Sequence, residues 1–203
     1  MKIICIGRNY ADHAKEMKAE LPTRPVFFMK PDVALLRENK DFYFPSFTKD
    51  LHYECELVVK IDKMGKHISE QFAHKYYSEI SLGIDFTARD LQQECKEKGL
   101  PWEIAKSFEH SAPISEVWIN KDSLALDNID FHLKKNNVVV QEGSSSDMIF
   151  NFDKVIAYVS QFMTLKTGDL IFTGTPAGVG PAQIGDRLQG FVGEREMFNF
   201  EIK

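Results

Sequence analysis

Short apolar runs separated by polar turns dominate this chain, and most of them have the length of a β-strand. Strand-like runs occupy residues 2–6, 26–29, 53–62, 80–86, 114–119, 129–134, 137–141, 169–173, 187–192 and 196–202. Helical periodicity occurs at residues 10–19, 87–98 and 153–162. Because strands outnumber helices and do not alternate regularly with them, the pattern predicts an α+β fold that is mainly β, with a few short helices.

The length and composition are typical of one globular domain. The chain has 203 residues, of which 43% are hydrophobic and 27% are charged. A chain of this length can bury about 70% of the surface that it exposes when unfolded. We therefore expect a single domain, residues 1–203, that needs no disulfide to hold it together.

Charge and cysteine content narrow the functional classes. The formal net charge of −5 argues against nucleic-acid and anionic membrane partners. The three cysteines, Cys5, Cys55 and Cys95, are odd in number and far apart, which is typical of reduced thiols. There is no run of about 18 apolar residues, and the first residues, MKIICIG, do not resemble a leader peptide. These features predict a cytoplasmic protein.

Glu54 and Glu56 stand at the entry of the strand predicted for 53–62. Residues i and i+2 of a strand share a face, so the two carboxylates lie together and Cys55 points to the other face. Two carboxylates on one face repel each other unless a cation pairs with them, and Mg²⁺ or Mn²⁺ prefers such oxygen ligands. An edge strand with solvated charges explains the same spacing, and His52 leaves a zinc-like His–Glu–Glu set open.

Asp85 lies where an apolar strand ends and the helix predicted for 87–98 begins. Asp85, Arg89 and Gln92 follow at i, i+4 and i+7, which places them on one stripe of a helical turn. Such a stripe can hold a metal and, through the planar fork of Arg89, a substrate carboxylate. A helix N-cap is the structural alternative for Asp85.

His13 and Glu16 are three residues apart in the first predicted helix and therefore share a face. A carboxylate beside a histidine raises its basicity and orients its ring, so the pair is a candidate general base. A surface ion pair is the alternative. Lys106, in PWEIAKSFEHSAP (101–113), is by itself no more than a solvated lysine. The glycine-rich TGTPAGVG (173–180) is either a tight turn or a set of N–H groups for an oxyanion.

Seven blocks, in this order along the chain, closely resemble the fumarylacetoacetate hydrolase superfamily. They are GRNYADHAKE (7–16), PVFFMKP (25–31), LHYECEL (51–57), DFTARDLQ (85–92), GLPWEIAKSF (99–108), QEGSSSDMIF (141–150) and LKTGDLIFTGTPAGVG (165–180). The chain looks most like the small single-domain branch of acylpyruvases and oxaloacetate decarboxylases. The resemblance implies a mixed β-sandwich roll, assembled as a homodimer. Asn136-Asn137 departs from the Asn-Gly turn of many relatives, but asparagine can still adopt the positive φ angles.

The resemblance also implies roles for individual residues. The ligands of the metal, Mg²⁺ or Mn²⁺, are Glu54, Glu56 and Asp85. The catalytic residues are His13, Glu16 and Lys106. The substrate contacts are Arg8, Arg89, Gln92 and Thr175. His52 is not a ligand in this pattern. A lid that includes residues 14–24 sets the substrate specificity, but its sequence does not indicate which acyl group is preferred.

The implied activity is the hydrolysis of acylpyruvates, such as acetylpyruvate or fumarylpyruvate, to pyruvate and a carboxylic acid. Oxaloacetate decarboxylation is a related expectation, because it too needs a Lewis acid at the 2-oxo group. The enzymatic alternatives are isomerases, hydratases or decarboxylases of meta-cleavage dienoic diacids and an oxaloacetate tautomerase. The alternative of another class is a non-catalytic metal-binding module. The predicted partner is a small β-dicarbonyl acid, not nucleic acid or a membrane.

Overall fold

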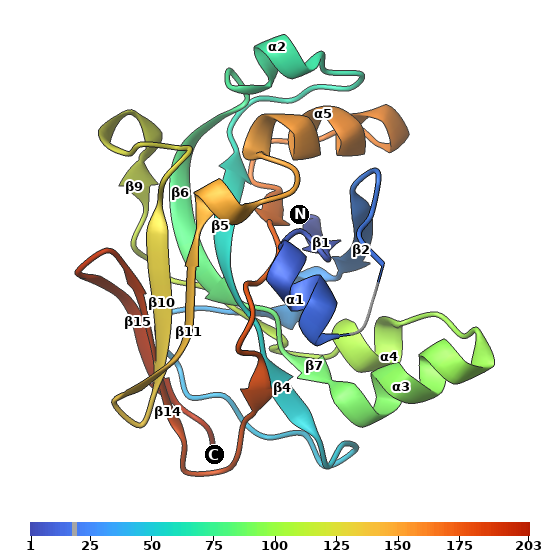
Figure 1. Ribbon diagram of the computed structural model, residues 1–203, viewed down its shortest axis with the longest axis vertical. Coiled ribbons are helices and arrows are strands. Elements are labelled where there is room, and N and C mark those ends of the chain that lie inside the picture. Colours follow the sequence, from blue (N-terminus) through green and yellow to red (C-terminus); the bar gives the residue numbers. More distant parts are fainter. Residues whose placement is uncertain (18–19) are drawn as a thin grey trace.

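The computed structural model describes residues 1–17 and 20–203, and two β-sheets form its centre (Figure 1). The strands of the larger, mixed sheet lie in the order β2 (Val26–Lys30), β1 (Ile3–Gly7), β12 (Leu170–Phe172), β5 (Cys55–Ile61), β6 (Tyr77–Ile84) and β9 (Ile119–Asn120). β1 and β12 run parallel, and the other neighbours run antiparallel. The second sheet is antiparallel, in the order β11 (Val138–Ser144), β10 (Asp130–Lys135), β14 (Arg187–Val192) and β15 (Arg195–Glu201).

Two small sheets continue the chain beyond the larger sheet. One contains β13 (Gly180–Pro181), β4 (Leu51–Tyr53) and β7 (Thr87–Ala88), and the other pairs β3 (Leu35–Leu36) with β8 (Ala112–Pro113). Glu54 alone separates β4 from β5, and Asp85 is the first residue after β6. Because β5 pairs with β6, with Cys55 opposite Ile84, these two breaks lie side by side. The chain therefore changes sheets where it carries two of its predicted metal ligands.

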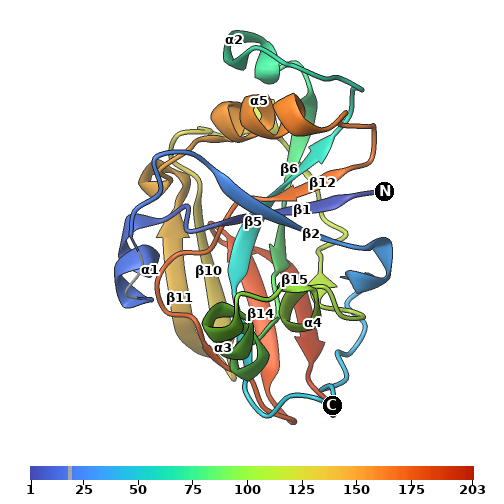
Figure 2. The same ribbon diagram turned by 90° about the vertical axis from the view of Figure 1, so that its right-hand side faces the viewer.

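In the described part of the chain, five short α-helices flank the sheets: α1 (Ala11–Glu16), α2 (Glu70–Ala73), α3 (Arg89–Lys98), α4 (Glu103–Lys106) and α5 (Phe152–Phe162). Among the described residues, α2 and α5 pack together at one end of the larger sheet, and α3 and α4 pack together near β2 and β7 (Figures 1 and 2). The Asn151 side chain caps α5 by accepting a hydrogen bond from Lys154 N at 2.9 Å. Gly99 ends α3 with φ +65°, the left-handed conformation that the sequence predicts there.

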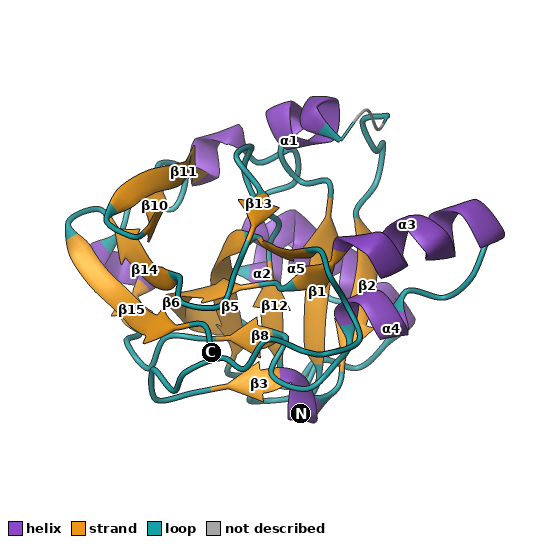
Figure 3. Cartoon of the chain, turned by 90° about the horizontal axis from the view of Figure 1, so that it is seen from below, coloured by secondary structure: helices purple, strands orange, loops and turns teal. Residues whose placement is uncertain are grey.

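The second sheet packs against β6 of the larger sheet, and α3 and α4 lie on the opposite side of the molecule (Figure 3). Gly190 in β14 permits the close approach, since a Cβ at this position would lie 2.8 Å from Leu82 Cδ2 in β6. Leu82, Phe131 and Phe198 belong to the buried cluster between the sheets. Burial of each such side chain contributes about 1.5–3 kcal/mol, so the core holds β5 and β6 firmly where they carry the site.

The predicted α+β, mainly β class is confirmed, and the expected strands and helices form with local corrections. The strand predicted for 53–62 is broken at Glu54, and the helix predicted for 87–98 begins at Arg89 because Thr87 and Ala88 pair with β4. The strand predicted for 114–119 is wrong for most of its length, since in this range only an isolated bridge at Ile114 and the first residue of β9, Ile119, form strand pairing. The helix predicted for 10–19 ends at Glu16, and residues 18–19 lie outside the described part of the chain.

Two further expectations concern the turn and the surface. Asn136 and Asn137 have φ angles of +53° and +66°, so the asparagine pair adopts the positive angles that the hairpin requires. Among the described helices, none combines the length and the apolar character that crossing a membrane requires.

Candidate active site

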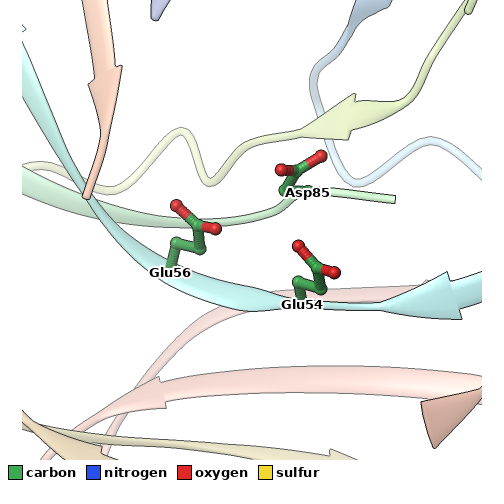
Figure 4. Close-up of side chains that lie close together, drawn as sticks. All are labelled: Glu54, Glu56 and Asp85. Carbon is green, nitrogen blue, oxygen red and sulfur yellow. The ribbon is translucent and has the colours of Figure 1, made fainter. Parts of the chain in front are cut away.

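Three carboxylates converge where β4 and β6 end and β5 begins (Figure 4). Glu54 lies between β4 and β5, Glu56 lies in β5, and Asp85 follows β6. Asp85 N donates a hydrogen bond of 2.8 Å to Glu54 O, which fixes the two breaks against each other. One carboxylate oxygen from each residue lies within 4.8 Å of the others, and all three residues are buried. The arrangement places three acidic ligands around one point.

Cations balance the outer part of this cluster. Lys106 Nζ lies 2.7 Å from Glu54 Oε2 and 2.8 Å from Asp85 Oδ2, and Arg89 Nη2 lies 2.7 Å from Glu54 Oε1. Burial by itself raises the pKa of Glu54, but Lys106 and Arg89 outweigh it and lower that pKa below its ordinary value. Burial likewise opposes the charge of Lys106, yet Asp85 and Glu54 hold its pKa above the ordinary value. Glu54 and Lys106 are therefore both charged at neutral pH.

Glu56 differs from the other two carboxylates. Its Oε2 accepts a hydrogen bond of 2.7 Å from Gly174 N, and no lysine or arginine of the described residues forms an ion pair with it. Burial, Asp85 and Glu54 raise the pKa of Glu56 well above its ordinary value. A buried carboxylate beside two others and without a cation is electrostatically unfavourable.

A divalent cation fits this donor set. Mg²⁺ and Mn²⁺ bind carboxylate oxygens. Such an ion would supply the positive charge that is missing beside Glu56. His52 is not part of the cluster, because its Nε2 lies 2.9 Å from Asp50 Oδ1 instead. The zinc-like His–Glu–Glu alternative therefore does not form, and the oxygen-only set with Asp85 does.

Lys30 is a residue of this site that no sequence pattern singled out. It ends β2 with its side chain fully buried, and its Nζ lies 2.8 Å from Asp85 Oδ1. The same ammonium donates to Ser111 Oγ at 2.9 Å and to Phe86 O at 3.2 Å, and it also contacts Lys106 O. Lys30 therefore binds the Asp85 oxygen that Lys106 does not contact, and it also holds the backbone carbonyl of Lys106. The only signal was a lysine at the end of the apolar run VFFMK, before Pro31.

His13 and Glu16 form the pair that their spacing predicts. His13 Nδ1 lies 3.0 Å from Glu16 Oε2, and His13 is 7% exposed on the wall of the cavity. Glu16 Oε1 accepts a hydrogen bond of 3.1 Å from Gly178 N. With the Nδ1 proton donated to Glu16, Nε2 is left as the basic nitrogen. The side chain is thus oriented as a general base requires.

The glycine-rich loop donates hydrogen bonds to carboxylates of the protein itself. Its Gly174 and Gly178 N–H groups donate to Glu56 and Glu16, so these two groups are not available to a substrate oxyanion. Both glycines have positive φ, +101° and +97°, which turns their amides towards the site. Thr175 lines the cavity, but its hydroxyl donates to Cys55 O at 2.9 Å and accepts from Gln141 Nε2 at 2.8 Å. Its role in substrate contact stays a prediction.

Arg89 and Gln92 lie on one face of α3, as predicted, whereas Asp85 is not on the helix. β7 intervenes between Asp85 and α3, so neither the helical stripe nor the N-cap explains Asp85. Arg89 Nη1 donates to Gln92 Oε1 at 2.8 Å while Nη2 reaches Glu54, and both residues line the cavity. Arg89 thus connects α3 to the acidic cluster.

These groups surround one cavity of about 70 Å³. Its charged and polar lining consists of Arg8, His13, Glu54, Glu56, Asp85, Arg89, Gln92, Lys96, Lys106 and Thr175. The apolar part of the wall consists of Ile6, Gly7, Met17, Val26, Phe28 and Trp102. Every site residue predicted from the sequence lines this cavity except Glu16, which contacts His13. The cavity suits a small anionic ligand.

Known proteins resemble this chain over nearly its whole length. The family model "Fumarylacetoacetate (FAA) hydrolase C-terminal" matches residues 2–203. Oxaloacetate tautomerase FAHD1 of Bos taurus, a mitochondrial protein, is 46% identical over 188 residues, which cover 92% of this chain and 85% of the relative. The mitochondrial oxaloacetate decarboxylase of Dictyostelium discoideum is 40% identical, covering 99% of this chain and 93% of the relative.

A solved structure supports the same assignment. Fumarylpyruvate hydrolase from Pseudomonas aeruginosa, in complex with Mn²⁺ and pyruvate, superimposes with a TM-score of 0.93 at 34% identity. The match covers 100% of this chain and 89% of that protein. The fold type that the sequence blocks imply is thereby confirmed.

Proposed function

The chain belongs to the fumarylacetoacetate hydrolase family, and on this premise we propose that it is a metal-dependent enzyme acting on small 2-oxo acids with a second carbonyl at C4. Oxaloacetate and acylpyruvates are the substrates of this class. One observation carries the proposal: the carboxylates of Glu54, Glu56 and Asp85 share one small cavity with His13 and Lys106. A site for a metal, a base and a cationic hydrogen-bond donor stand together there.

The acidic cluster would hold Mg²⁺ or Mn²⁺ through Glu54, Glu56 and Asp85. When bound, the ion would supply Lewis acidity towards the 2-oxo group of the substrate. Lys106 uses two of its three protons on Glu54 and Asp85. The third proton is available to a substrate oxygen on which negative charge develops, and such a preset donor stabilises that charge.

The reactions of this class share a proton transfer at C3, and the His13–Glu16 pair carries out this transfer. In keto–enol tautomerisation of oxaloacetate, His13 accepts a proton from C3 and returns it to the 2-oxygen, so that no bond between carbons breaks. Glu16 keeps the Nδ1 proton in place and stabilises the imidazolium while it exists. The similarity to oxaloacetate tautomerase of Bos taurus supports this reaction.

Hydrolysis of an acylpyruvate is the second candidate, and the oriented dyad favours it. His13 takes a proton from water, the hydroxide adds to the C4 carbonyl, and the C3–C4 bond breaks with its electron pair on the pyruvate fragment. The imidazolium of His13 returns its proton to C3 of that fragment, and a carboxylic acid and pyruvate leave. The similarity to fumarylpyruvate hydrolase supports this route. Decarboxylation of oxaloacetate breaks the same bond with loss of CO₂ and needs no attacking water.

The test measures three reactions of the purified protein with Mg²⁺ or Mn²⁺, each with an EDTA control. Ketonisation of enol-oxaloacetate is followed by ultraviolet absorbance, and pyruvate release is measured from oxaloacetate and from acetylpyruvate. Metal-dependent turnover of at least one substrate supports the proposal, and the fastest reaction identifies the activity. If metal binds but none of the three reactions is catalysed, the proposal fails and longer dienoic diacids become the substrates to test.

We further propose that the enzyme is a homodimer and has no nucleic-acid or membrane partner, as the family resemblance and the acidic charge suggest. The cytoplasmic location also stays a prediction, while the relatives from Bos taurus and Dictyostelium discoideum are mitochondrial proteins. Sedimentation of the purified chain and fractionation of its cells test these two expectations.

A further inference from the structure

Positively charged side chains outnumber carboxylates in the lining of the cavity. Four cationic side chains of the described residues line it, against three carboxylates, and a bound divalent cation would add two more positive charges. The cationic side chains are Arg8, Arg89, Lys96 and Lys106. Arg89 and Lys106 are paired with the acidic cluster, whereas no carboxylate of the described residues pairs with Arg8 or Lys96.

Lys96 is placed by α3 and by an indole ring. Arg89, Gln92 and Lys96 follow at i, i+3 and i+7, so all three lie on the face of α3 that borders the cavity. Helical side chains lean towards the N-terminus, which directs Lys96 back towards Gln92. Its Nζ lies 5.7 Å from the centre of the Trp102 ring, on the cavity wall. Burial together with Arg89 and Arg8 lowers the pKa of Lys96, as expected for a cation among cations.

Arg8 is held in an unusual backbone conformation. Its φ is +59°, in the left-handed region that a residue with a Cβ rarely adopts. The next residue, Asn9, fixes this turn through hydrogen bonds to the backbone of Phe150, at 2.8 and 2.9 Å, and to Thr173 O at 2.8 Å. Strain of this kind persists where the surrounding structure imposes it, often at a binding site. Arg8 is thereby presented to the cavity from the side of β1.

We propose that Lys96 and Arg8 form a subsite for the distal carboxylate of a dicarboxylic substrate, so that the enzyme selects dianions such as oxaloacetate over monoanions of the same length. The inference rests on the proposed function, because it takes the 2-oxo acid end of the ligand to lie at the acidic cluster. Lys96 and Arg8 are specificity-determining residues in this assignment, and they do not take part in the bond changes.

Equilibrium binding tests the subsite without turnover. Malate and 2-hydroxybutanoate differ in a distal carboxylate against a methyl group, and neither carries the 2-oxo group on which the proposed reactions depend. Calorimetric titration with Mg²⁺ compares both ligands on the wild type, Lys96→Met, Lys96→Arg and the matched control Lys98→Met. Lys98 lies on the same helix, is exposed and pairs with Glu94 at 2.7 Å, away from the cavity.

The wild type should prefer malate by about tenfold or more, the value of one charged hydrogen bond. Lys96→Met should remove most of this preference and leave 2-hydroxybutanoate binding unchanged, Lys96→Arg should keep it, and Lys98→Met should not alter it. An unchanged preference in Lys96→Met, an equal loss for both ligands, or no malate preference in the wild type overturns the subsite. If none of the three reactions is catalysed, the proposed function is overturned. The subsite is still supported in that case if Lys96→Met, and neither Lys96→Arg nor Lys98→Met, loses affinity for malate.

Discussion

The floor and the rim of the cavity are held in different ways. The floor consists of Glu54, Glu56, Asp85 and Lys106, and the rim consists of α1, Arg8, Lys96 and Trp102. Floor residues are at most 6% exposed, and short ion pairs join Lys106 to Glu54 and Asp85, whereas Lys96 is exposed and Arg8 and Trp102 are half-buried. β5 and β6 position the three carboxylates of the floor and the short helix α4 carries Lys106, whereas α1, α3 and loops position the rim. The proposed metal ligands thus lie beside two strands of the core, and the His13–Glu16 pair and the residues proposed to meet the rest of the substrate lie on the elements around them.

Lys30→Met should break the floor most severely. The variant leaves the buried Asp85 with one cation fewer and frees the carbonyls of Phe86 and Ser111, so the free energy of unfolding should fall by about 3–5 kcal/mol. Urea denaturation measures the change. Lys66→Met removes an exposed lysine and serves as the control, with no measurable loss. Equal stability of the two variants would contradict the role of Lys30 in the floor.

His13→Ala separates the base from the metal site. Loss of the general base should lower kcat by at least about 100-fold, while the affinity for Mg²⁺ or Mn²⁺ remains, because His13 is not in the acidic cluster. Steady-state kinetics and metal titration of the same sample give both values. Glu54→Ala should instead weaken metal binding itself. Parallel loss of activity and metal affinity in His13→Ala would argue against a role as base.

Glu56→Gln should stabilise the metal-free floor. The amide keeps an acceptor for Gly174 N and removes a buried charge that has no cation, so unfolding in EDTA should cost about 1–2 kcal/mol more at pH 8. The folded pKa of Glu56 is raised, so its carboxylate destabilises the folded state only once pH rises above the unfolded pKa near 4.5. The advantage of Glu56→Gln should therefore be small near pH 4.5 and grow towards pH 8. Urea unfolding at both pH values tests this, and an advantage that shrinks with rising pH would refute it.

Asp12→Ala should have the smallest effect. Asp12 precedes His13 on α1, but its carboxylate is exposed and contacts only the exposed Lys15 among the described side chains, at 2.8 Å. The free energy of unfolding should change by less than about 0.5 kcal/mol, and kcat by less than about twofold. Thermal unfolding and the activity assay check both. A large loss would mean that α1 acts through more than the dyad.

The sequence predicted the floor better than the rim because a strand imposes a strict period. Alternation alone put Glu54 and Glu56 on one face, whereas in the rim only the spacing of three on a helix, which joined His13 to Glu16, gave a comparable signal. Asp85 was assigned to the site for the wrong geometric reason, since the two-residue strand β7 intervenes before α3. Such a short strand has no pattern of its own and exists only because β4 lies beside it.

Lys30 and Lys96 escaped prediction for opposite reasons. Lys30 is buried only because Asp85, Phe86 and Ser111, distant in sequence, converge on it. Lys96 looks like any solvated residue of an exposed helix, and its significance depends on the position of Trp102 and Arg8. In both cases a lysine acquires its meaning from tertiary neighbours that no local pattern describes.

The glycine-rich loop also fixes the spacing between two carboxylates. Gly174 and Gly178 are four residues apart, and each donates to one carboxylate, Glu56 in the acidic cluster and Glu16 beside His13. The length of this loop therefore sets the distance between the acidic cluster and the His13–Glu16 pair. A single inserted or deleted residue between Gly174 and Gly178 would detach one centre from the other without altering any catalytic side chain. Along this stretch the number of residues is as strictly constrained as their identity.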